Sequence, residues 1–181
     1  GEYSFDLSSR ETLDTRLGVF ANFRPSLPKS FAATPFVFLG NIDPELQLSV
    51  LNQMERPKLV ACDSMNYWIE GKPEALKRLL PRVDILFIND GEIRQLTGEN
   101  NLVRAVSVLR RLGSTAVVVK RGEHGVLVFE EDSAFALPAF PLDSVVDPTG
   151  AGDAFAGGFL GYLASRGLKG ERDLRTAAVV G

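Results

Sequence analysis

Short apolar runs alternate with amphipathic stretches from residue 36 onward, and this alternation restricts the fold more than any other feature. Each run is brief and rich in Val, Ile, Leu or Phe, as strands buried on both faces are. The four clearest runs are 36–40, 58–62, 85–89 and 116–120. Helical patterns fill the intervals, most clearly from Leu102 to Leu112, where one face is apolar and Gly113 marks the end. The alternation predicts an α/β fold, a mostly parallel sheet with helices on both faces.

Prolines and turn residues refine this prediction. Pro44 and Pro73 stand where a first helical turn would begin, ahead of periodic apolar residues. The runs 126–129 and 134–137 are separated by a short turn and predict a hairpin rather than another crossover unit.

The first thirty residues follow a different pattern. Apolar residues alternate with polar ones at 3–7 and again at 17–23, which predicts two strands of a small sheet. Three prolines then follow, at 25, 28 and 35. We therefore place a boundary near Ser30, with a small β segment at 1–30 and an α/β core at 31–181.

Composition excludes several classes of function. With 45% apolar and 24% charged residues the chain is neither disordered nor fibrous. A net charge of −3 gives no basic excess for nucleic acid or an anionic membrane, so any bound phosphate must be held locally. The single cysteine, Cys62, excludes an internal disulfide framework and favours a reducing compartment. A cytoplasmic location is the resulting expectation.

The segment Asp147-Pro148-Thr149-Gly150-Ala151-Gly152-Asp153 combines a glycine turn with the start of a helix. Gly150 and Gly152 allow bare backbone to approach a ligand, and the unpaired N–H groups of a first helical turn receive anions, typically phosphate. Asp153 would repel a phosphate unless it takes a proton from a hydroxyl that attacks one. The alternative is that Asp153 only complements the helix dipole, while Gly157, Gly158 and Gly161 serve close packing.

This segment, extended as Asp-Pro-Thr-Gly-Ala-Gly-Asp-Ala-Phe-x-Gly-Gly-Phe, resembles the C-terminal signature of the ribokinase-like (PfkB-type) carbohydrate and nucleoside kinases. Asn89-Asp90-Gly91-Glu92 is similar to the Asn-x-x-Glu motif of that family, and residues 120–125 are similar to its nucleotide-contacting turn. The resemblance covers roughly 36–181. The stretch from Asn41 and the early strands look most like bacterial nucleoside or adenosine kinases.

The resemblance implies ATP-dependent phosphorylation of a hydroxyl on a sugar or nucleoside. It implies that Asp153 is the catalytic base and that Gly150, Ala151 and Gly152 supply backbone N–H groups to the transferring phosphoryl group. For Mg²⁺, the resemblance implies Asn89 and Glu92, with Glu92 binding through water. For ATP it implies Lys120, Gly122 and Gly125, which would lie along the nucleotide. For a monovalent cation such as K⁺ it implies Asp147.

Plainer interpretations of the same residues stay open. Asn89 with Glu92 three positions on is also an ordinary helix-capping pair, and Lys120 could face solvent. Asp63 and Asn66 only approximate a family Asp-x-Asn element, with one extra residue between them, so either could be a strand-end cap. His124 is the only histidine and is expected to be a loop residue beside the nucleotide.

Family members are typically longer, and their acceptor-binding residues precede anything that corresponds to Gly1. We therefore expect an interior fragment, incomplete at both ends, in which 1–30 is part of a β lid. Lids of relatives often pair between subunits, so a homodimer through the lid is one expected partner arrangement. The alternative function is a nucleotide-binding module without turnover, because the acceptor site is missing. A dinucleotide-dependent dehydrogenase is disfavoured, because no Gly-x-Gly-x-x-Gly follows the first buried strand.

Overall fold

A computed structural model describes residues 2–3, 10–11, 18–114, 116–131, 133–167 and 173–181. Its main feature is a six-stranded sheet in the order β3-β4-β5-β6-β7-β8. The strands are β3 Phe36–Leu39, β4 Leu59–Asp63, β5 Ile85–Asn89, β6 Ala116–Lys120, β7 Val126–Glu130 and β8 Ser133–Leu137. Neighbours from β3 to β6 are parallel, whereas β7 and β8 form an antiparallel hairpin on β6. The predicted α/β sheet and hairpin are confirmed.

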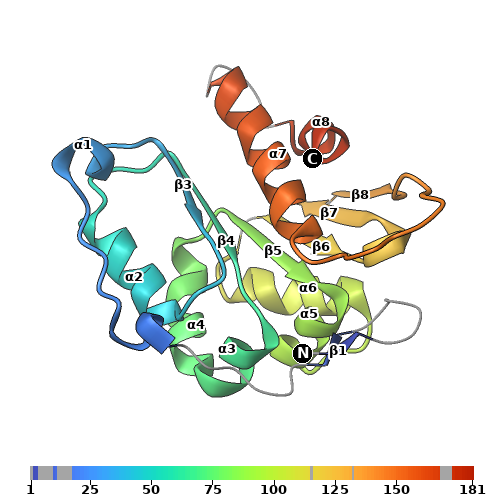
Figure 1. The fold of residues 1–181 in the computed structure, drawn as a ribbon, viewed down its shortest axis with the longest axis horizontal. Helices are drawn as coiled ribbons and strands as arrows, with labels where there is room; N and C mark the ends of the chain where they lie inside the picture. The colour runs from blue at the N-terminus through green and yellow to red at the C-terminus, as the bar shows by residue number, and fades with distance from the viewer. Residues whose placement is uncertain (1, 4–9, 12–17, 115, 132, 168–172) are drawn as a thin grey trace.

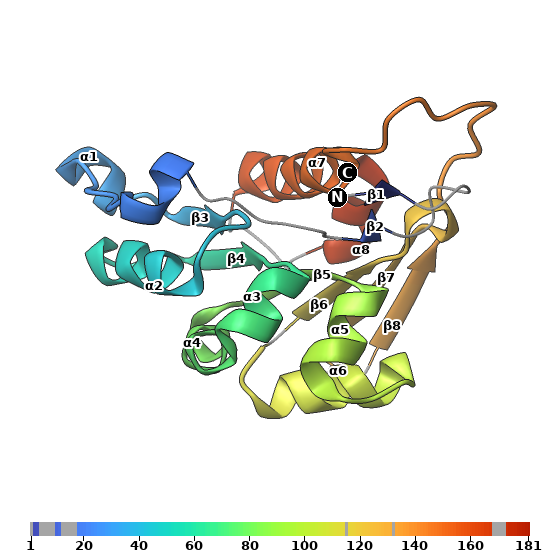
Figure 2. The ribbon, with the colours of Figure 1, turned by 60° about the horizontal axis from the view of Figure 1, so that its bottom comes forward.

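Helices cover both faces of the sheet (Figures 1 and 2). One face carries α2 Pro44–Gln53, α3 Asn66–Gly71, α4 Pro73–Leu79, α5 Asp90–Thr97 and α6 Leu102–Arg111, and the other carries α7 Ala151–Arg166 and α8 Leu174–Val180. Short helical turns complete the described elements: η1 Gly18–Asn22, α1 Lys29–Ala32, η2 Leu80–Arg82 and η3 Gly122–His124.

Strict alternation along the strands separates two apolar cores. In β5, Leu86 and Ile88 pack with the helices of the α2–α6 layer, while Ile85 and Phe87 pack with α7 and α8. The ring of Phe87 meets Phe159 of α7 edge-on, with 5.3 Å between ring centroids. Because side chains alternate across a sheet, the last residues of β4, β5 and β6 face α7.

Local signals in the sequence account for the helix ends. The Asp43 side chain accepts a 2.9 Å hydrogen bond from Glu45 N ahead of Pro44, and Asn101 caps α6 in the same way. Gly113 follows α6 with φ of +112°, and a Cβ there would lie 2.6 Å from Pro81 Cα. Only glycine fits this turn.

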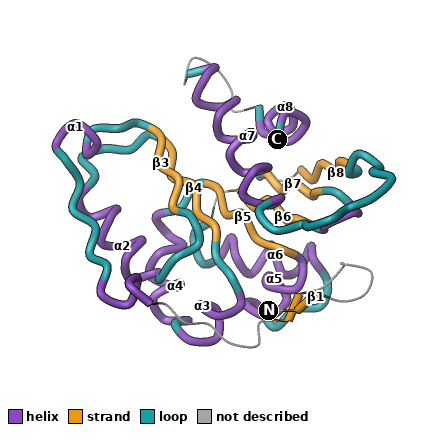
Figure 3. Tube along the Cα trace, in the orientation of Figure 1, coloured by secondary structure: helices purple, strands orange, loops and turns teal. Residues whose placement is uncertain are grey.

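Two expectations for the chain were wrong, and the tube in Figure 3 shows the first. Residues 18–22 form the 3-10 helix η1 rather than a strand. Within the described residues no strand pairs with them, and Val19 is 88% exposed, so the apolar alternation has no sheet to bury it. The second is the close packing expected of three glycines in α7. Gly157 and Gly161 have open space at their Cβ positions, and of the three only Gly158 packs closely, with its Cβ position 3.0 Å from Gly181 Cα.

The predicted strand at 3–7 is described only at its start. Glu2–Tyr3 (β1) pairs antiparallel with Arg10–Glu11 (β2). Residues 4–7 lie outside the described residues, as does Leu17. The helix α3, which Asn66 begins, was not predicted.

Candidate functional site

Three polar residues end three adjacent parallel strands on the face that α7 covers. Asp63 ends β4, Asn89 ends β5 and Lys120 ends β6. Asn89 is the register partner of Lys120, and Asp63 is the partner of Phe87, two residues earlier on β5. Directly opposed residues share a face, and so do residues two apart, so all three point toward α7. In open parallel sheets, ligands bind at this edge.

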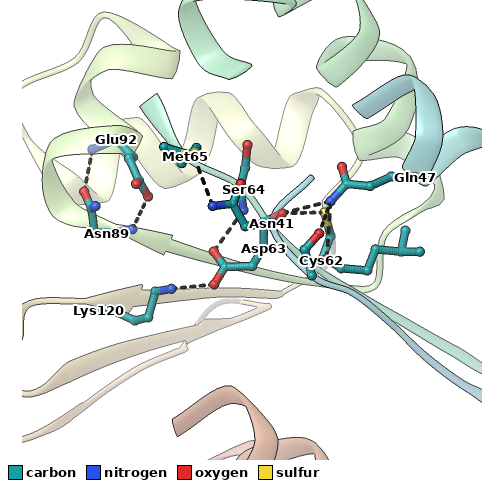
Figure 4. Close-up of polar contacts among 11 residues, drawn as sticks. Asn41, Gln47, Cys62, Asp63, Ser64, Met65, Asn89, Glu92 and Lys120 are labelled. Carbon is teal, nitrogen blue, oxygen red and sulfur yellow. Dashed lines mark hydrogen bonds and ion pairs between the residues drawn. The ribbon is translucent and has the colours of Figure 1, made fainter. Parts of the chain in front are cut away.

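Lys120 and Asp63 form an ion pair across β5 (Figure 4). Lys120 Nζ lies 2.6 Å from Asp63 Oδ2, and Asp63 Oδ1 accepts a 2.9 Å hydrogen bond from Ser64 N. The Asp63 side chain is only 4% exposed and that of Lys120 is 21% exposed. Burial raises the pKa of Asp63, and the ammonium of Lys120 offsets part of that rise. Lys120 is therefore held by a partner rather than left to solvent.

Asn89 and Glu92 form a reciprocal capping box at the start of α5. Glu92 N donates to Asn89 Oδ1 at 2.7 Å, and Asn89 N donates to Glu92 Oε2 at 2.9 Å (Figure 4). The capping interpretation of this pair is confirmed. Burial raises the pKa of Glu92 from 4.5 to about 7, opposed by the Asn89 hydrogen bond and by the charge of Lys120. Glu92 is partly exposed, and its carboxylate keeps one oxygen outside the capping box, which suits it to bind a cation.

The turn before α7 leaves its carboxylates accessible. Hydrogen bonding from the Thr149 side chain lowers the pKa of Asp147, and so does the 2.8 Å hydrogen bond that Asp147 Oδ1 accepts from Thr149 N. Gly150 has φ of +84° and is the N-cap of α7, with no side chain capping the helix. Asp153 lies exposed in the first turn. The turn therefore presents backbone and one carboxylate rather than a packed surface.

One of the backbone donors expected for phosphate is already in use. Ala151 N donates to Pro148 O at 3.2 Å, a long hydrogen bond that closes the turn, and Ala154 N donates to Gly150 O at 2.8 Å. A phosphate that used Ala151 N would have to compete with Pro148 O.

Lys120 joins the strand ends to this turn. A Cβ at Gly152 would lie 3.2 Å from Lys120 Nζ, so the ammonium sits directly against the first turn of α7. The charge of Asp153 also acts on Asp63, and that of Lys120 acts on Glu92. Motifs that lie far apart in the sequence thus meet at one place: the Asp63 segment, the Asn89 and Glu92 pair, the end of β6 and the α7 turn.

The glycines after β6 differ from each other. Gly122 has φ of +56° and open space at its Cβ position. Gly125 has φ of +80°, and a Cβ there would lie 2.6 Å from Ala139 N, against the backbone that follows β8. Packing therefore explains why position 125 requires glycine. Contact of either glycine with a nucleotide stays a prediction. His124 lies exposed in η3, next to Glu123.

Sequence reasoning missed the pairing of Asp63 with Lys120 and a pocket that lies apart from this site. Asp63 was expected to be a strand-end cap or a loose match to a family element, and its partner Lys120 could not be predicted because it lies 57 positions away in the chain. A pocket of about 480 Å³ also escaped notice; its lining residues include Phe20, Arg24, Ile42, Tyr67, Trp68 and Lys72. None of the strand-end residues lines it, so it is separate from the site at α7. Asn66 is half-buried at the start of α3.

Metal ligands do not cluster in the described residues, where no group of three or more His, Cys, Asp or Glu side chains is placed to hold an ion. A Mg²⁺ ion bound mainly through water and phosphate oxygens needs only one or two carboxylates. Glu92 meets that need, because Oε1 takes part in none of the hydrogen bonds described for this region. Likewise, no described helix combines the length and apolar character of a membrane span.

The fold and this site define an α/β protein of the ribokinase-like class. The family described as pfkB family carbohydrate kinase matches residues 28–181. The chain belongs to this family.

Among curated relatives, a cytidine kinase of Thermococcus kodakarensis is 36% identical over 149 residues, which cover 79% of this chain and 53% of that protein. The crystal structure of aminoimidazole riboside kinase from Salmonella enterica matches with a TM-score of 0.65 at 27% identity, over 81% of this chain and 54% of that one. The nucleoside kinase of Methanocaldococcus jannaschii shares the fold, with a TM-score of 0.68 at 22% identity, over 90% of this chain and 50% of that one. This chain spans about half the length of the relatives it matches.

Proposed function

We propose that the chain carries the nucleotide site and catalytic base of an ATP-dependent kinase that phosphorylates a hydroxyl of a sugar or nucleoside. One observation supports this most directly: the Lys120 ammonium lies against the first turn of α7, the same turn that presents the Asp153 carboxylate. Phosphoryl transfer requires alignment and charge stabilisation more than covalent chemistry, and a cation beside a helix N-terminus supplies both.

In this proposal the residues of the turn have separate roles. Asp153 accepts the proton of the acceptor hydroxyl, whose oxygen forms a bond to the γ-phosphorus as the bond to the ADP oxygen breaks. Gly150, Ala151 and Gly152 present backbone N–H groups to the moving phosphoryl group, with Ala151 leaving Pro148 O to do so. Lys120 balances negative charge on the phosphates.

Glu92 would hold Mg²⁺ through water beside the phosphates, and the ion would offset their charge. Its partly buried carboxylate supports that role, and Asn89 orients it through the capping box. Gly122 and Gly125 would lie along ATP in the turn after β6. A monovalent cation such as K⁺ near Asp147 stays a prediction, as do the cytoplasmic location, the β lid at 1–30 and a homodimer through that lid.

The names of relatives support two acceptor classes. Cytidine kinase and nucleoside kinase are nucleoside enzymes, and fructokinase and ribokinase are sugar enzymes, and all match this chain. The longest of the curated matches described above is to a cytidine kinase, so we favour a nucleoside.

A second function is a nucleotide-binding module without turnover. The observation that favours it is that Ala151 N, one of the backbone donors proposed for the transferring phosphoryl group, already donates to Pro148 O.

Isothermal titration with ATP and Mg²⁺, alongside a phosphotransfer assay, separates the two proposals. The acceptor panel is ribose, fructose, adenosine, inosine and cytidine. Binding with transfer to one acceptor supports the kinase, and binding without transfer supports the module. Absence of MgATP binding would contradict both.

A further inference from the structure

We infer that Asp63 is a positioning residue for the nucleotide site: it holds the Lys120 ammonium at the one place where the strand ends meet the first turn of α7. The inference deepens the proposed function and rests on it. Asp63 itself contacts no phosphate in this scheme, and it acts through Lys120.

The Asp63 carboxylate is fixed from both sides. Oδ1 accepts from Ser64 N at 2.9 Å and Oδ2 accepts from Lys120 Nζ at 2.6 Å, which leaves the buried carboxylate no freedom to turn away. A lysine side chain, by contrast, loses much rotamer entropy when it is held in one place. The buried acid therefore determines where the flexible cation resides.

The backbone of Asp63 is also anchored. Gln47 Nε2 donates to Asp63 O at 3.1 Å and to Gly40 O at 2.8 Å, so one buried amide ties the ends of β3 and β4 together (Figure 4). Gln47 is 1% exposed. Because its anchor comes from α2, the position of the carboxylate does not depend on the ligand side of the sheet.

The Lys120 ammonium has competing acidic neighbours. Glu92 lies close enough for its pKa to respond to Lys120, and Asp153 lies close enough to act on Asp63. Without Asp63, the released ammonium would be drawn toward Glu92 or Asp153, which the proposed function reserves for Mg²⁺ and for the acceptor proton. Gly152 leaves the room that the held position needs, since a Cβ there would lie 3.2 Å from Nζ.

A double-mutant cycle with Asp63→Asn and Lys120→Gln tests this inference in the full 181-residue chain. The readout is the Kd for MgATP divided by the Kd for adenosine, which lacks phosphates. We expect Asp63→Asn to weaken MgATP binding about tenfold in the wild-type background and less than twofold when Lys120→Gln is already present. Adenosine binding should change less than twofold throughout, which a general loss of structure would not produce.

Lys72→Gln serves as the matched control, because Lys72 forms an ion pair of the same 2.6 Å length with Asp43, outside the strand-end cluster. Asp63→Asn should weaken MgATP binding as strongly with Lys72→Gln as without it. If Asp63→Asn alone fails to fold, the double variant Asp63→Asn with Lys120→Gln is compared with Lys120→Gln alone, and a loss of MgATP binding greater than twofold would overturn the positioning role.

The outcomes distinguish a failure of the positioning role from a failure of the proposed kinase function. Equal losses from Asp63→Asn in both Lys120 backgrounds, or a parallel loss of adenosine binding, would overturn the positioning role and leave the kinase proposal standing. A wild-type chain that does not bind MgATP would overturn both.

Discussion

The strand ends and the α7 turn face each other but are built in opposite ways. At the strand ends, Asp63 is almost fully buried and both of its carboxylate oxygens have a partner inside the fold. At the turn, Gly150 and Asp153 are exposed and no side chain caps the helix. The contacts at the strand ends form when the chain folds, whereas the turn presents backbone donors and a carboxylate to a ligand. Changes at the turn should therefore affect chemistry, and changes at the strand ends should affect stability as well.

Asp153→Asn gives the largest expected effect. Turnover in an active chain should fall about 10²- to 10⁴-fold, because the amide cannot accept the acceptor proton, while the Kd for MgATP stays within about threefold. Steady-state kinetics and titration measure the two. Glu74→Gln, at an exposed first-turn acid of α4, is the control and should leave turnover unchanged. Wild-type turnover in Asp153→Asn would refute the base assignment.

Lys120→Met tests how firmly the strand ends depend on their ion pair. Removing the ammonium leaves Asp63 buried without its cation, so the free energy of unfolding should fall by about 3 kcal/mol. Lys72→Met breaks a pair whose lysine is 33% exposed and should cost less than about 1 kcal/mol. Urea denaturation measures both. Equal losses would show that burial does not distinguish the two pairs.

Gly125→Ala and Gly122→Ala separate packing from backbone conformation in the turn after β6. Both glycines have positive φ, which costs an alanine about 1 kcal/mol or more. Gly125→Ala also forces Cβ against the backbone at Ala139, so its loss of unfolding free energy should exceed about 2 kcal/mol. Denaturant midpoints with constant slopes would measure the difference. If Gly122→Ala were the more damaging, the packing explanation would fail.

Glu92→Gln should produce the smallest effect on stability, because Glu92 is partly exposed, and that effect should appear as a change with pH. The folded chain raises the pKa of Glu92 from 4.5 to about 7, so the folded state binds that proton more tightly than the unfolded state. Stability from this group therefore falls as pH rises from about 4.5 to 7. Glutamine keeps the acceptor for Asn89 N but cannot titrate.

Urea denaturation at pH 5 and pH 8 without Mg²⁺ checks this. Glu92→Gln should lose less stability than wild type between the two pH values. An identical loss in both proteins would show that Glu92 does not titrate in this range.

Local patterns predicted most of the fold. The four parallel strands, the capping pair of Asn89 and Glu92 and the hairpin after Lys120 each depend on residues within a few positions of one another. The strand expected at 17–23 was wrong because a strand depends on a pairing partner from elsewhere in the chain. A strand exists only with a partner, and alternation alone does not reveal whether a partner is present.

The amino-acid sequence by itself determined the α/β alternation, the family signature around Asp153 and the capping pair of Asn89 and Glu92, because each is encoded in a contiguous stretch. Only the tertiary structure decided that Asp63 pairs with Lys120, 57 positions away, and that this ammonium rests against Gly152. Strand order and register bring those residues together. They follow from how two cores pack on opposite faces of the sheet, which no short stretch of sequence specifies.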